Sequence, residues 1–249
     1  MKRSLLSVDL RLALKEPGCP ICRLRADAEL RYIRSLLWEF VNDPLTRSRF
    51  IASLGYCREH TWQVGLLEKE KFGSSLGTAI LYEHLTLVVS GRLKDYTRRM
   101  GWARRPWWKR WLYVFWPWSA RRLAARELTP ETPCRVCQIG ERAEQAHLEW
   151  LIRGLAAPEH DFRDAYRASD GLCLYHLRRG LASAPREVEG GARVLVESTV
   201  QRLETLEQDL REYQRKHSWD YRHEAQTPGE QLAWLRALRF YGGNGQTET

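Results

Sequence analysis

The chain has 249 residues, a formal net charge of +9 and a hydrophobic content of 43%. This composition excludes wholesale disorder and allows one large domain or two of ordinary size. A run of about 18 apolar residues, which a transmembrane helix requires, does not occur. The N-terminus starts like a signal peptide, but Asp9, Arg11 and Lys15 interrupt the apolar segment that export requires. We therefore expect a cytoplasmic protein without a membrane span.

The first hundred residues predict a series of amphipathic helices. Apolar side chains recur at helical spacing over residues 24–40, and Pro44 ends this pattern. A short helix to Ser53, a helix that Cys57 opens and a long helix over residues 77–99 follow. We find neither a strand pattern nor a glycine-rich nucleotide loop, so we expect an all-α fold.

A basic, tryptophan-rich segment follows these helices. Residues 92–126 contain eleven Lys/Arg against one acid, and six of the eleven tryptophans lie between residues 102 and 118. Arginine beside tryptophan is typical of segments that lie in an anionic membrane interface. The same composition suits stacking on single-stranded nucleic acid, or burial against the protein body or in a homo-oligomer. The residues that we expect to form this surface are Trp102, Arg104, Arg105, Trp107, Trp108, Lys109, Arg110, Trp111, Trp116 and Trp118.

The second half of the chain repeats the cysteine motifs of the first half. The Cys-x-x-Cys motif recurs after 115 residues and the Cys-x-x-His motif after 116, and the repeat uses all six cysteines. Ala28-Glu29 aligns with Ala143-Glu144, and apolar positions agree at helical spacing. We therefore expect two copies of one helical fold. The four motifs are Cys19-x-x-Cys22, Cys57-x-x-His60, Cys134-x-x-Cys137 and Cys173-x-x-His176.

Each copy offers three thiolates and one imidazole, a ligand set that zinc prefers in closed structural sites. We predict two structural zinc ions per chain, one in each copy. The first site would consist of Cys19, Cys22, Cys57 and His60, and the second of Cys134, Cys137, Cys173 and His176. An iron–sulfur cluster, a redox dithiol and unmetallated cysteines are the alternatives.

Enzymatic chemistry is not expected, because no set of nucleophile, base and oxyanion donors can be assembled. Glu144-x-x-His147 matches half of a carboxylate-bridged di-iron motif, but Tyr32 stands where the first copy would need a histidine. We therefore expect Glu144 and His147 to lie on an exposed helix surface.

The C-terminal part predicts two further helices. Residues 191–217 form a long amphipathic pattern, and Thr227, Pro228 and Glu230 are typical of the start of another helix. That last helix would run to Phe240 and stop at Gly242-Gly243. The predicted divisions are a first lobe at 1–100, a linker at 101–126, a second lobe at 127–223 and a C-terminal helix and tail at 224–249.

The paired Cys-x-x-Cys and Gly-x-Cys-x-x-His motifs, together with the closing helix over residues 233–240, resemble an uncharacterised bacterial family of helical cysteine proteins. The resemblance covers most of the chain, except for the basic linker, and implies bacterial origin and no known activity. Our expectation is a non-catalytic binding or scaffold module that meets an anionic membrane surface or a protein partner. A redox or iron–sulfur protein and a nucleic-acid-binding protein are the alternatives.

Overall fold

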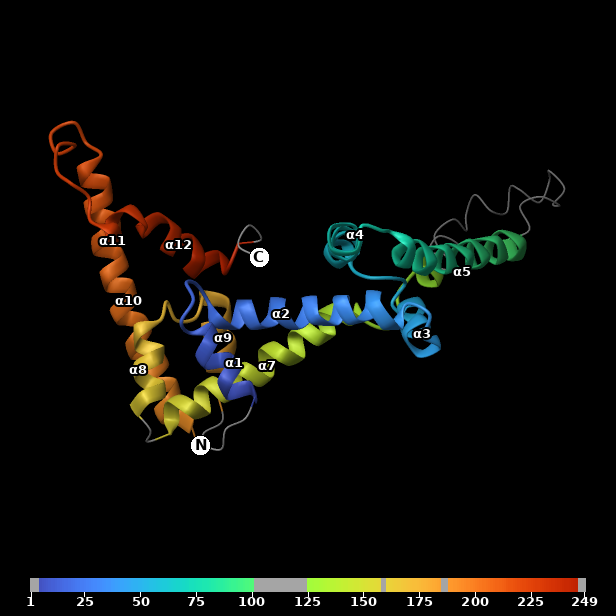
Figure 1. Ribbon diagram of the computed structural model, residues 1–249, viewed down its shortest axis with the longest axis horizontal. Coiled ribbons are helices and arrows are strands. Elements are labelled where there is room, and N and C mark those ends of the chain that lie inside the picture. Colours follow the sequence, from blue (N-terminus) through green and yellow to red (C-terminus); the bar gives the residue numbers. More distant parts are fainter. Residues whose placement is uncertain (1–4, 101–124, 158–159, 185–187, 246–249) are drawn as a thin grey trace, which may run out of the picture. The chain divides into compact units, whose positions relative to one another are not determined.

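The computed structural model describes residues 5–100, 125–157, 160–184 and 188–245, and every regular element in these residues is a helix (Figure 1). The all-α prediction is therefore confirmed. None of the described helices is both long and apolar enough to cross a bilayer. The ten linker residues predicted to form a surface, from Trp102 to Trp118, lie outside the described residues.

The chain divides into two compact units. Unit 1 combines residues 1–28 with residues 140–249, and unit 2 consists of residues 29–139. The boundary falls inside helix α2, Pro20–Ser35, and inside helix α7, Arg135–Ala156. Each unit therefore joins the first part of one sequence copy to the later part of the other copy.

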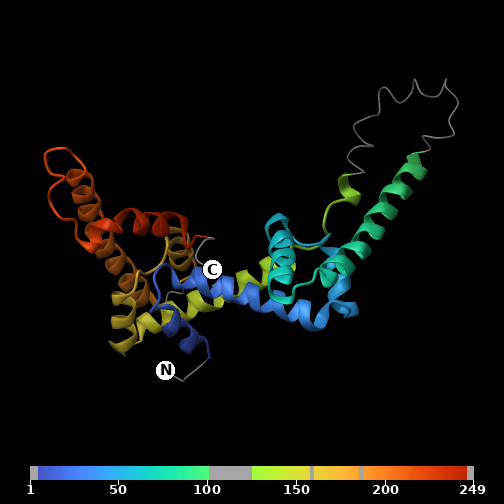
Figure 2. The ribbon, with the colours of Figure 1, turned by 45° about the horizontal axis from the view of Figure 1, so that its top comes forward.

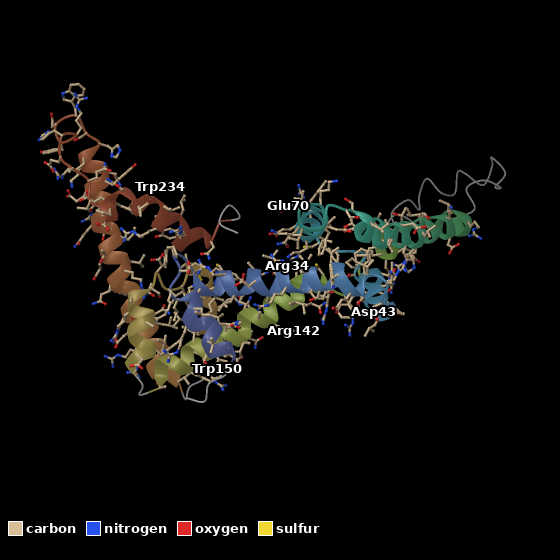
Figure 3. The ribbon with its side chains drawn as sticks, viewed as in Figure 1. Arg34, Asp43, Glu70, Arg142, Trp150 and Trp234 are labelled. Atoms are coloured by element: carbon tan, nitrogen blue, oxygen red, sulfur yellow. The ribbon has the colours of Figure 1, made fainter. Side chains whose placement is uncertain are left out.

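Unit 2 is built from the later helices of the first copy. After α2 the chain continues through a π-helical turn, Leu36–Phe40. Asp43, labelled in Figure 3, then caps the next helix by accepting a hydrogen bond from the Thr46 amide at 2.7 Å. The helices that follow are α3, Pro44–Ala52; α4, Arg58–Phe72; and α5, Leu76–Met100. These bounds confirm the helices predicted for the first hundred residues.

The start of α5 is fixed by a buried carboxylate. Glu68 accepts hydrogen bonds from the amides of Gly77 and Thr78 at 2.7 and 2.8 Å, which satisfies donors that a helix N-terminus leaves unpaired. The end of α2 and the start of α7 both contribute residues to the core of unit 2. The buried apolar residues of this core are Ile33, Leu36, Val41, Phe50, Tyr56, Val64, Leu67, Leu81, Leu85 and Val136.

Unit 1 contains the first helix of the chain and the later helices of the second copy (Figure 2). They are α1, Leu5–Ala13; α8, His160–Ala168; α9, Leu174–Ser183; α10, Glu189–Lys216; α11, Pro228–Gln231; and α12, Ala233–Gly242. The first helix of the chain, over residues 5–13, was not predicted from the sequence.

The C-terminal helix starts with the predicted capping box between Thr227 and Glu230. It is not one helix, however, because the chain leaves helical geometry at Leu232 and separates α11 from α12. Helix α12 then turns back to contact α10 and α9, as Figure 1 shows. The buried apolar core of unit 1 consists of Leu10, Ala13, Leu14, Cys19, Ile21, Leu24, Leu148, Leu151, Ile152, Leu155, Phe162, Tyr166, Leu172, Cys173, Val194 and Leu195.

Candidate metal centres

The eight cysteine and histidine residues of the repeat gather into two clusters of four. Site 1, in unit 1, consists of Cys19, Cys22, Cys173 and His176. Site 2, in unit 2, consists of Cys57, His60, Cys134 and Cys137. Within each cluster the donor atoms lie within 4.8 Å of one another.

The prediction of two Cys3His clusters is therefore confirmed, but the prediction that each copy supplies all four residues of its own cluster is wrong. The Cys-x-x-Cys motif of each copy meets the Cys-x-x-His motif of the other copy. Both copies have nearly the same spacing between motifs, so the exchange leaves no trace in the spacing. The exchange resembles a domain swap carried out inside one chain.

All four motifs start a helix. Cys19, Cys57, Cys134 and Cys173 each immediately precede a helix, and the second ligand of each motif is its third helical residue. Each of these cysteines also accepts the first helical hydrogen bond with its carbonyl oxygen, at 2.8 to 3.3 Å. This is the spacing of a capping box, which turns both side chains over the helix N-terminus. Each site is thus the meeting point of two helix N-termini.

The position of the ligands at helix N-termini favours negatively charged sulfur. The N-terminus of a helix carries a partial positive charge and unpaired amide donors, and both stabilise thiolates. Three thiolates and a dication give a centre with one net negative charge, which two helix N-termini can offset. The local fold therefore supplies the electrostatics that a Cys3His metal centre requires.

Glycine shapes the turn before each Cys-x-x-His motif. Gly55 and Gly171 have φ values of +89° and +75°, in the region that favours glycine. The next residues, Tyr56 and Leu172, are buried and anchor the turn in the two cores. These glycines belong to the Gly-x-Cys-x-x-His motif, and their positive φ gives a physical reason for the first position of that motif.

The sulfur–sulfur distances match tetrahedral coordination, and most of the sulfur–nitrogen distances are somewhat shorter than it requires. Zinc bonds of ordinary length imply about 3.8 Å between two sulfurs and about 3.6 Å between sulfur and nitrogen. In site 1 the three sulfurs lie 3.2 to 3.4 Å from His176 Nδ1, and Cys22 Sγ lies 3.8 Å from Cys173 Sγ. In site 2 the sulfurs lie 3.1 to 3.7 Å from His60 Nδ1, and Cys57 Sγ lies 3.7 Å from Cys137 Sγ.

These sulfur–sulfur distances are far too long for a disulfide, and all six cysteines are free. The residues present therefore fit one tetrahedral cation in each site. An iron–sulfur cluster would spread its thiolates over several irons, and this requires wider spacing than one ion.

The geometry favours charge separation between the imidazole and one thiol of each site, Cys173 or Cys134, while burial raises the pKa values of the Cys19 and Cys137 thiols. Burial alone would raise the pKa of the Cys134 thiol, but hydrogen bonds from His60 and from backbone amides lower it to about 6. Burial opposes protonation of His60 and His176, but hydrogen bonds to cysteine and glutamate raise their pKa values to about 10 and about 11. A cation in either site would replace the imidazole proton, so metal binding should release protons.

A glutamate carboxylate lies close to Nε2 of each histidine. His60 Nε2 lies 3.5 Å from a carboxylate oxygen of Glu29, and His176 Nε2 lies 3.6 Å from one of Glu144. When Nδ1 holds a metal, Nε2 carries the proton, and a carboxylate facing it fixes the tautomer and the ring orientation. Glu29 and Glu144 occupy equivalent positions in the repeat. Each site therefore has its own carboxylate next to its histidine.

Glu144 is fully buried and faces two arginines as well as His176. Arg25 and Arg179 each place a guanidinium nitrogen 2.9 Å from one of its oxygens. Burial alone would raise the pKa of Glu144, but His176, Arg179 and Arg25 together lower it. The expectation that Glu144 and His147 lie on an exposed helix surface is therefore wrong, since both side chains are buried.

The C-terminal segment covers site 1. Asn244 accepts a hydrogen bond from the Cys19 amide at 2.7 Å and donates one to the Cys19 carbonyl at 3.1 Å. Gly243 has a φ of +75°, and a Cβ atom there would lie 3.0 Å from Cys22 Sγ. Cys19 and Cys173 are buried, whereas all three cysteines of site 2 are half-buried. Site 1 is therefore the better shielded of the two sites.

The roles of Glu29, Glu144 and Asn244 were not predicted from the sequence. The alignment of Ala28-Glu29 with Ala143-Glu144 was a signal for the first two, because a charged residue retained with the ligands fits an outer ligand. No such signal exists for Asn244, since the repeat does not include the C-terminal segment.

Comparison with known proteins gives a family and no function. The family model described as Family of unknown function (DUF6062) matches residues 1–246. No curated protein and no solved structure matches the chain.

Proposed function

We propose that this chain, which belongs to the Family of unknown function (DUF6062), is a non-catalytic zinc protein whose two Cys3His centres are structural. The observation that carries the proposal is the tetrahedral spacing of four soft donors where two helix N-termini meet, present twice in the chain. Four protein ligands leave no coordination position for water or substrate, which favours a structural role over a catalytic one.

The centres would serve the fold as cross-links between the two sequence copies. Each centre ties the start of one copy to a helix of the other copy that lies more than seventy residues away in the chain. Metal binding at such a site is coupled to folding, because the unfolded chain does not hold the ligands together. Each unit would then be a metal-stabilised helical body suited to a binding or scaffold role.

Protein purified under reducing conditions should contain about two zinc ions per chain and should be colourless. Elemental analysis and a visible spectrum test this expectation. Exchange with cobalt should give the absorption of tetrahedral cobalt with thiolate ligands, because the donor geometry is fixed by the helices. A visible spectrum of the purified protein with bound iron and sulfide would support the iron–sulfur alternative instead.

The basic linker supports a second part of the proposal, a role at an anionic membrane surface. Residues 92–126 carry eleven Lys/Arg with one acid, and six tryptophans lie among them. Basic residues near a membrane are attracted by anionic lipids, and tryptophan prefers the headgroup region. Zinc-linked helices would then present this segment to the membrane from the cytoplasm.

Replacement of Trp107, Trp108, Trp111 and Trp116 with alanine should abolish the salt-resistant part of binding to anionic vesicles. The remaining binding should weaken as salt rises, because it depends on a screened attraction. Co-sedimentation with vesicles of mixed anionic and neutral lipid measures both parts.

The matched control replaces Trp38 and Trp219, which are 74% and 75% exposed outside the linker, and should bind as the parent does. Both variants should keep two metal ions. Tight binding to single-stranded nucleic acid but not to vesicles would contradict the membrane role. A lower melting temperature or a dissociated oligomer, without affinity for vesicles, would show that the tryptophans are core or interface.

A further inference from the structure

Unit 1 contains a cavity of about 450 Å³ that the metal centres do not use. It is lined by α10, by α12 and by residues 167–173, and it touches site 1 only at Cys19 and Cys173. This volume lies in the range of pockets that hold small molecules.

The lining of the cavity is strongly cationic. Arginine residues from three helices reach it, namely Arg167 of α8, Arg202 of α10, and Arg236 and Arg239 of α12. The one carboxylate in the lining is Asp170, and it already accepts a hydrogen bond from the Gly18 amide at 2.6 Å. Such a lining favours an anionic occupant.

The charge of Arg202 is not neutralised by a carboxylate in the part of the chain that the structure describes. Its guanidinium donates to the carbonyl oxygens of Ser169, at 3.0 Å, and of Tyr166, and lies over the Tyr166 ring. Arg236, in contrast, pairs with Asp209, and Arg167 pairs with Asp164 at 3.6 Å. The carbonyl contacts hold Arg202 in place beside the cavity and leave its positive charge for an incoming anion.

A buried guanidinium nitrogen of the lining also lacks a partner. Arg202 Nη1 is buried and has no hydrogen-bond partner among the described residues, and the buried residue Ser198 lines the same cavity. Its neighbour Thr199 donates to the Leu195 carbonyl at 2.7 Å, the usual solution for a hydroxyl inside a helix. Buried polar groups without a partner are rare, and one that lines a cavity is explained by a ligand that completes its hydrogen bonding.

The remaining wall is apolar and includes Leu203, Leu206 and Phe240. An inorganic anion would leave this wall without a contact, whereas an organic anion would bury its body there. We propose that this cavity binds a small organic anion, with an oxyanion head group (carboxylate or phosphate) at the arginines and Ser198 and an apolar body against Phe240. This proposal is independent of the zinc proposal, because it uses none of the metal ligands as a recognition group.

Binding of small probes to the full chain tests the assignment. Isothermal titration calorimetry with five probes separates the contribution of the anionic head group to affinity from that of the apolar body. The probes are phenyl phosphate, benzoate, inorganic phosphate, benzamide and benzylamine. We expect saturable binding of phenyl phosphate or benzoate, at least tenfold weaker binding of inorganic phosphate and benzamide, and none of benzylamine. The tighter of the two aryl anions identifies the head group that the site prefers.

Two variants locate the site. Arg239→Gln removes a charge from the lining, and Ser198→Leu fills the cavity, so each should weaken the aryl anion at least tenfold. The matched control is Arg193→Gln, because Arg193 lies on the same helix as Ser198 but is exposed and pairs with Glu197 at 2.7 Å. Circular dichroism and metal content show whether each variant is folded.

Several results would overturn the proposal. They are equal affinity for benzamide and benzoate, equal affinity for inorganic and phenyl phosphate, the same loss in Arg193→Gln as in Arg239→Gln, or no saturable binding of either aryl anion. If Arg239→Gln does not fold, Ser198→Leu decides, since unchanged binding in a variant with a filled cavity contradicts the site.

Discussion

Replacement of Cys19 and Cys173 together with alanine should leave one metal ion per chain, whereas replacement of Cys19 and Cys57 together should leave none. The first pair belongs to site 1 alone, so site 2 keeps all four ligands. The second pair removes one ligand from each site. Three-ligand sites bind metal far more weakly, and dialysis against a chelator that spares the parent protein should empty them. Elemental analysis of the dialysed proteins gives the counts.

A double variant of site 2 and a control variant complete this test. Cys57→Ala with Cys134→Ala should leave one ion, held by site 1, and His223→Ala, which lies outside both sites, should leave two. If each copy instead closed its own site, Cys19→Ala with Cys57→Ala would leave one ion and Cys19→Ala with Cys173→Ala would leave none. The two pairings thus predict opposite counts for the three double variants, and two ions in His223→Ala either way.

Helix geometry explains why the pairing is crossed. From Cys22 to Leu36 the chain rises by about 20 Å along one helical path, at 1.5 Å per residue. Cys57 follows the nine-residue helix α3 and belongs to unit 2, whereas Cys22 belongs to unit 1. The start of α7 shares the core of unit 2 with the end of α2, so Cys134 and Cys137 are the thiolates within reach of His60.

The sequence was sufficient to identify the eight residues of the two clusters and the helices that carry them. Ligand identity follows from motif spacing, and the helix bounds follow from apolar periodicity and from Pro44 and Thr227 at two starts. Pairing could not be predicted, because sites within a copy and sites between copies require the same spacing. Such a choice depends on where long helices place their ends, which is a property of the whole fold.

Buried charge was the other feature that the sequence did not predict. Glu144 lies in a polar stretch of α7, and a glutamate in such a stretch is usually solvated. Its burial depends on Arg25, which lies more than a hundred residues earlier, and on Arg179 of α9. The periodicity of one helix contains no information about partners that come from other helices.

The substitution Glu144→Gln should weaken zinc binding at site 1 by about 10- to 100-fold, the usual cost of losing an outer ligand. It should also lower the free energy of unfolding by about 3 kcal/mol, because it removes a buried negative charge that faces Arg25, Arg179 and His176. The loss lies at the lower end for buried ion pairs, since both guanidinium groups retain some contact with water. Competition with a chromophoric chelator gives the affinity, and denaturant unfolding gives the stability.

Acid unfolding separates a charge effect from a packing effect at Glu144. Its pKa is lower in the folded protein than the ordinary value of 4.5, so its contribution to stability is present above that value and is lost as pH falls through the lower one. Glu144→Gln should therefore lose most stability near neutral pH and little in acid. The matched control is Glu149→Gln, because Glu149 lies on the same helix and accepts a hydrogen bond from Gln145 at 3.2 Å, and this variant should change neither quantity. A variant equally destabilised at all pH values would show that Glu144 acts by packing, and unchanged zinc affinity would show that it does not orient His176.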